Sequence, residues 1–102
     1  MDTLKGKSRA YAPPRRLPPA HALTAIDAVA SLGSLVKAAE HLGITRSAVS
    51  HRLALLENAL GFDVVKRCGR NGIKLTPRGR RYAEGVHKAL AILCEAQCRN
   101  DV

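Results

Sequence analysis

Two segments with helical periodicity lie only two residues apart in this chain, and this spacing limits the folds that are open to it. Ser34 is a good N-cap for the first segment, and Thr45 is a good N-cap for the second. Gly43 and Ile44 alone separate the two segments. Apolar residues recur at helical spacing on both sides of this turn: Leu35, Ala39 and Leu42 before it, and Val49, Leu53, Leu56 and Leu60 after it. The pattern predicts two short helices that cross closely through a tight turn.

The second of these helices begins with polar side chains, in the stretch TRSAVSHRLALLE of residues 45–57. Arg46, Ser47 and Ser50 fall in its first turn and a half, on the side away from the apolar stripe. The stripe anchors the helix in a core, and the polar end is therefore a presented surface.

Further elements are expected on either side of this pair. An apolar helical run from Leu23 stops at Gly33, and Asn71-Gly72 is a strong tight-turn signal for a hairpin over residues 64–76. Thr76-Pro77 opens a helix that continues to about Arg99. The order predicts a mainly α fold, a winged helix-turn-helix with three helices and a β-hairpin wing, followed by a long helix.

We divide the chain accordingly into three parts. Residues 1–18 hold a proline-rich basic tail, residues 19–76 the winged helix-turn-helix, and residues 77–102 a linker or dimerisation helix. Within the second part, the helix-turn-helix motif covers about residues 35–54 and the wing about residues 64–76.

Positive charge is concentrated rather than spread. Of the net charge of +9, the block from residue 61 to 81 contributes most, with seven basic residues and one acidic one. Such a block favours a polyanionic partner, and nucleic acid comes before a membrane surface because the charges group on a hairpin rather than along an amphipathic helix. No segment has the length of apolar residues that a membrane span or a signal peptide needs, so we expect a cytoplasmic protein.

The run SLVKAAEHLGITRSAVSHRLALLENALGFDVVKR, followed by LTPRG, closely resembles the N-terminal DNA-binding domain of LysR-type transcriptional regulators. The elements AAExL, TxSAVSxxL and LExxLG keep the spacing of that family. The resemblance implies a bacterial, sequence-specific transcriptional regulator that binds double-stranded DNA at a dyad-symmetric operator as a homodimer. Members of the family normally continue into an effector-binding domain. We do not expect such a domain within these 102 residues, and so we expect no small-molecule effector for them.

The resemblance also assigns candidate DNA contacts. Positions 46, 47, 50 and 51 face bases or phosphates in the family, and the wing position of residue 70 reaches the backbone or the minor groove. We therefore predict a DNA-binding set of Arg46, Ser47, Ser50, His51, Arg52, Arg70 and Lys74. The family often has Gln at position 46, and Arg46 here favours guanine or phosphate over adenine.

The long helix carries an apolar seam at spacings of three and four residues, predicted as a dimer interface, formed by Ala83, Val86, Leu90 and Leu93. We expect the rest of the small domain to leave this seam uncovered. An alternative function is an interaction protein that heterodimerises with full-length relatives through this helix.

No catalytic residues, cofactor or metal site are predicted, because no nucleophile has a positioned base and the three cysteines lack a zinc-finger spacing. His87, Cys94 and Cys98 share one face of the long helix. A metal or thiol switch there is conceivable, but we favour two buried small side chains and a surface histidine.

Overall fold

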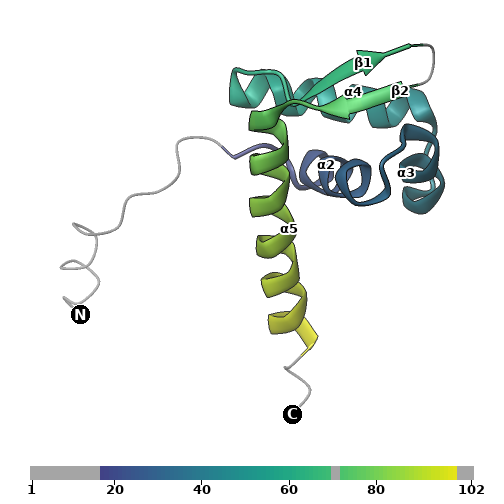
Figure 1. Ribbon diagram of the computed structural model, residues 1–102. Coiled ribbons are helices and arrows are strands. Elements are labelled where there is room, and N and C mark those ends of the chain that lie inside the picture. Colours follow the sequence, from purple (N-terminus) through teal and green to yellow (C-terminus); the bar gives the residue numbers. More distant parts are fainter. Residues whose placement is uncertain (1–16, 70–71, 99–102) are drawn as a thin grey trace.

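The computed structural model describes residues 17–69 and 72–98 (Figure 1). In chain order the elements are α2 (Ala20–Leu32), α3 (Leu35–Leu42), α4 (Arg46–Leu60), β1 (Val65–Cys68), β2 (Gly72–Leu75) and α5 (Pro77–Cys98). The fold class predicted from the sequence, a winged helix-turn-helix followed by a long helix, is confirmed. Arg70 and Asn71 lie outside the described residues, and so does the tail up to residue 16.

The turn between α3 and α4 has the local structure that its residues favour. Gly43 adopts φ 72°, a left-handed conformation that costs glycine little, and its backbone N–H donates to the carbonyls of Ala39 and Glu40. The Thr45 hydroxyl then accepts a hydrogen bond from the Ala48 backbone N–H at 3.0 Å and caps α4. Together these bonds end one helix and begin the next within three residues.

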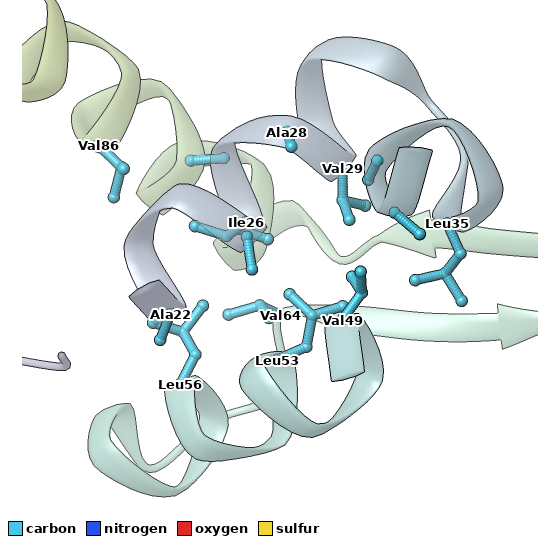
Figure 2. Packing of buried hydrophobic residues seen from close by; sticks show 14 residues of the cluster. Ala22, Ile26, Ala28, Val29, Leu35, Val49, Leu53, Leu56, Val64 and Val86 are labelled. Carbon is cyan, nitrogen blue, oxygen red and sulfur yellow. The ribbon is translucent and has the colours of Figure 1, made fainter. Parts of the chain in front are cut away.

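Helices α2, α3 and α4, the residue before β1 and the first half of α5 enclose an aliphatic core. Figure 2 shows its side chains converging from α2, α3 and α4, with Val64 approaching from the hairpin and Val86 from α5. Ile26, Val49, Leu56 and Val64 are the largest side chains that solvent does not reach. Val49, Leu53 and Leu56 carry out the predicted anchoring of α4, and Leu60 is partly buried at the end of the same stripe.

The wing, formed by β1 and β2, is a two-stranded antiparallel hairpin with a defined register. Val65 pairs with Leu75, Lys66 with Lys74, and Arg67 with Ile73. Since side chains alternate along a strand and opposite residues share a face, Arg67 lies on the half-buried face with Val65, Ile73 and Leu75. Lys66 and Lys74 share the other face.

Hydrogen bonds attach the wing to the helices at its base. A carboxylate oxygen of Glu57 in α4 accepts from the backbone N–H groups of Val64 and Val65, at 2.9 and 3.3 Å. The Thr76 hydroxyl donates to the Asp63 carbonyl at 2.8 Å and accepts from the Gly79 N–H at 2.9 Å, where α5 begins. These bonds fix where the wing emerges relative to α4.

Helix α5 starts on the domain and then leaves it. Its first half packs against α2 and β2, and its second half extends away from the other elements (Figure 1). His87 of α5 and Asp27 of α2 are joined by a hydrogen bond at this exit, with 2.8 Å between Nδ1 and Oδ1. Burial raises the pKa of the Tyr82 phenol, in the first half of α5, above its ordinary value.

Two expectations about α5 are wrong. Ala83 and Val86, predicted as part of an uncovered seam, are only 3% and 7% exposed because the domain itself covers the start of the helix. Leu90 packs partly against the same core, whereas Leu93 is exposed. Cys94 and Cys98, expected to be buried, are both exposed because they lie on the part of α5 that has left the domain.

Candidate nucleic-acid interface

The first turn and a half of α4 forms a polar recess together with the wing. A hollow of about 280 Å³ is lined by Leu35 of α3, by Arg46, Ser47 and Ser50 of α4, and by Arg67 of β1. The Arg67 guanidinium donates a hydrogen bond of 3.5 Å to the Ser50 hydroxyl, across 17 positions of sequence. Two guanidinium groups and two hydroxyls thus surround one opening, and none of the side chains that line it is acidic.

This arrangement follows from the packing described above. The buried stripe of α4 turns Arg46 and Ser47 to the outside, where both are exposed, and leaves Ser50 half-buried at the edge of the wing. The register of the hairpin places Arg67 on the face that lies against α4. The recess therefore depends on both elements, and a guanidinium at its rim is suited to anionic phosphate or to the acceptor atoms of a guanine edge.

The structure brings together only part of the predicted set of contacts. Arg46, Ser47 and Ser50 line the recess, whereas His51 is exposed beside it on the next turn of α4. Arg52 is half-buried on another side of the helix. Lys74 lines a separate hollow of about 310 Å³ between α2, β2 and the start of α5. Arg70 lies outside the described residues.

Arg67 is the residue that the sequence reasoning missed. It belongs to the basic wing, but nothing in its local sequence separates it from Lys66 or Lys74. Its alternation with Val65 is the available signal, because a residue two positions from a half-buried valine on a strand shares its face.

On the opposite face of the hairpin, Lys66 and Lys74 stand directly across from each other, and both are exposed. Like charges at opposite positions of two strands repel each other. A polyanion near this face would relieve the repulsion, so the outer face of the wing is electrostatically suited to a nucleic-acid backbone.

Two other kinds of site are absent from the described residues. None of the helices there is both long and apolar enough to cross a membrane. In the same part of the chain, no three or more histidine, cysteine or acidic side chains are grouped to hold a metal ion.

A short helix joined to a presented helix by a tight turn, with a basic wing beside it, defines a winged helix-turn-helix DNA-binding domain. Residues 20–80 match the family model described as "Bacterial regulatory helix-turn-helix protein, lysR family". The chain belongs to this family, as its sequence motifs predicted.

Curated relatives agree with this assignment. The chain is 42% identical over 82 residues to the "Glycine cleavage system transcriptional activator homolog" of Haemophilus influenzae, covering 80% of this chain and 27% of the relative. It is 46% identical over 75 residues to the "HTH-type transcriptional regulator TrpI" of Pseudomonas aeruginosa, covering 74% of this chain and 25% of that protein. The chain thus spans about a quarter of the length of these relatives.

Solved structures of DNA complexes are also similar. The CbnR DNA-binding domain in complex with DNA has a TM-score of 0.71 at 26% identity, over 79% of this chain and 92% of that one. The BenM DNA-binding domain in complex with the catB site 1 DNA has a TM-score of 0.73 at 27% identity, over 79% and 90% of the two chains. Neither the relatives nor these structures support the alternative of a protein that acts only by heterodimerisation.

Proposed function

We propose that this domain binds double-stranded DNA, with the start of α4 in the major groove and the wing on the flanking backbone, and that it regulates transcription. The observation that carries the proposal is the recess in which Arg46, Ser47 and Ser50 of α4 meet Arg67 of the wing. A helix whose first turn is polar and whose opposite face is buried presents that turn to a groove. Two similar domains have been solved as complexes with DNA, which supports DNA as the ligand.

The residues divide into two roles in this proposal. Ser47 and Ser50 are short donors that let α4 approach the base edges, and Arg46 binds a guanine edge or a phosphate. His51 and Arg52 reach phosphates at the edge of the contact, and Lys66, Arg70 and Lys74 neutralise the backbone along the wing. Arg67 stands between the two groups, because it contacts the α4 hydroxyl from the wing.

We further propose that the domain acts as a homodimer on a dyad-symmetric site through the second half of α5. Ile92 and Leu93 are 64% and 56% exposed there, and Ala89 and Ala96 are exposed on the same side of the helix. Exposed apolar side chains at such spacings mark a partner surface. This surface replaces the predicted seam, because Ala83 and Val86 are already buried within the chain. An antiparallel pairing of two such helices relates the two α4 helices by a two-fold axis.

Salt dependence tests the DNA-binding proposal. If one domain neutralises about four phosphates, the logarithm of the association constant should fall with the logarithm of salt concentration at a slope of about −3.6, and at about twice that for a dimer. Fluorescence anisotropy with a labelled duplex over a range of salt concentrations measures the slope. Lys66→Ala and Lys74→Ala should each reduce its magnitude by about one. A slope near zero would overturn the proposal.

A further inference from the structure

Cys94 and Cys98 are two exposed thiols on the last turns of α5. Residues four positions apart on a helix are neighbours, with about 5–6 Å between their Cβ atoms, so the two thiols stand side by side. Unpaired cysteine is among the residues most often buried in proteins. Two of them exposed next to each other are therefore not explained by packing.

The position of the pair keeps it accessible. At about 100° per residue, Cys94 and Cys98 lie roughly opposite the exposed apolar residues Ala89, Ile92 and Leu93 on α5. A helix that covered those apolar residues would leave the thiols open to solvent. The third cysteine, Cys68, lies on the wing at the other end of α5 (Figure 1), so it cannot join the same site.

The surroundings determine which ligand the pair suits. His87 lies on the same side of α5, but it comes seven residues before Cys94, about 10.5 Å along the helix axis, and its Nδ1 is held at the Asp27 carboxylate at 2.8 Å. The described residues offer no third ligand for the closed tetrahedral site that structural zinc requires. Thiolates favour soft centres, and a centre that is satisfied by two of them fits this pair.

We propose that Cys94 and Cys98 together form a bis-thiolate site for a soft, thiophilic ligand, either a trivalent arsenical or a soft metal cation. On binding, two sulfur–ligand bonds form and both thiols lose their protons. An arsenoxide releases its oxygen as water with these two protons, and a cation releases them to solvent. No oxidation or reduction takes place.

Such a bridge would act on the end of α5. Helix ends fray, and a link between positions i and i+4 holds the last turn closed. Occupation of the site would therefore stabilise the part of α5 that we propose for dimerisation. This consequence rests on the proposed function, whereas the binding itself does not.

Phenylarsine oxide is the probe for the first test, because its stable adduct requires two neighbouring thiols. The wild-type chain should gain one arsenical by intact mass, and a thiol-reactive dye should then find one of its three thiols still free. Cys68→Ser should keep the adduct, and Cys94→Ser and Cys98→Ser should each lose it. Circular dichroism of the unliganded variants controls for folding.

Titration of the same variants with Ag⁺ separates a cation from an arsenical. Binding of either probe in a ratio of one per chain, with both Cys94 and Cys98 required, supports the site. The probe that binds shows whether the ligand is an arsenical or a cation. The proposal is overturned if Cys94→Ser and Cys98→Ser bind both probes as the wild type does. It is also overturned if one ligand joins two chains, or if Cys94 and Cys98 form only disulfides between chains. A failure of the DNA-binding test would leave these results unaffected.

Discussion

Gly79 of α5 shows how closely a single residue is fitted where the wing meets the helices. A Cβ atom at Gly79 would lie 2.7 Å from both the Cα and the carbonyl carbon of Val64, and closer still to the carbonyl oxygen. The Val64 carbonyl also accepts a hydrogen bond from the Thr76 N–H at 2.9 Å. Gly79 is thus needed for close approach between α5 and the base of the wing. Gly85, in the same helix, has open space around it.

The two positions therefore form a matched pair for mutation. Gly79→Ala should destabilise the fold by about 1–3 kcal/mol, because the backbone of Val64 must move to make room for the methyl group. Gly85→Ala should instead stabilise it by about 0.5–1 kcal/mol, because alanine is the better helix residue at an open site. Urea unfolding followed by circular dichroism measures both changes. A neutral Gly79→Ala would show that α5 and the wing are not in close contact.

At the scale of elements, the interface divides between α4 and the wing. Arg46 belongs to α4 alone, whereas Arg67 reaches from β1 to Ser50. The hydrogen bond between Arg67 and Ser50 is lost when either residue is changed. The effects of Arg67→Ala and Ser50→Ala on DNA binding should therefore not be independent.

We expect Ser50→Ala to reduce discrimination between a cognate and a scrambled duplex, and Arg46→Ala to do so by about 1–3 kcal/mol if its contact is bidentate to a guanine. Lys74→Ala should weaken binding to both duplexes alike, because a backbone contact carries no sequence information.

Arg67→Ala should weaken binding to both duplexes and also reduce discrimination between them. The double variant Arg67→Ala with Ser50→Ala should lose less binding free energy than the sum of the two single losses. Competition binding with the two duplexes measures these differences. Additive losses would show that Arg67 contacts the backbone without positioning Ser50.

The helices and the hairpin were predictable from the sequence, because each begins or ends at a residue with a local signal. Ser34, Thr45 and Gly43 place the motif helices, and Thr76 places the start of α5. Arg46, Ser47 and Ser50 followed from the same helical periodicity. Their contact with Arg67 did not, because it joins residues 17 positions apart and depends on the register of the hairpin relative to α4.

The prediction for α5 failed for a different reason. Periodicity showed one apolar face containing Ala83, Val86, Leu90 and Leu93, but it carries no information on where along the helix the domain stops covering that face. Tertiary packing divides the face near Leu90, which is partly buried. The same boundary explains why Cys94 and Cys98 are exposed, since both come after it.

At the scale of the whole molecule, the two proposed interfaces lie at opposite ends. In the part of the chain that the structure describes, α4 and the wing lie at one end and the second half of α5 extends to the other (Figure 1). The recess belongs to the first of these ends. Side chains at the first end are charged or polar, and Ile92 and Leu93 at the second are apolar. The molecule thus separates the end that we propose faces DNA from the end that we propose pairs with a second chain.

This separation leads to a prediction about dimerisation. Ile92→Glu with Leu93→Glu should abolish pairing, because it would bring like charges together in an apolar contact. Ala83 and Val86 lie inside the chain's own core, so Val86→Ala should lower the stability of the domain without removing the partner surface. Ala91→Glu is the control for an added charge on α5, because Ala91 is exposed and lies about 160° around the helix from both Ala89 and Leu93.

Sedimentation of the free chain and of its complex with a palindromic duplex provides the measurement. The wild type and Ala91→Glu should bind the palindrome as two chains per duplex, and the double glutamate variant should bind as one chain with lower affinity. The affinity of the variant for a single half-site should be unchanged, because the recess of α4 and the wing is intact in each chain. Since two linked half-sites raise the effective concentration for the second contact, the loss should appear only on the palindrome. Equal affinity of the wild type and the double variant for that duplex would show that the second half of α5 does not pair the chains.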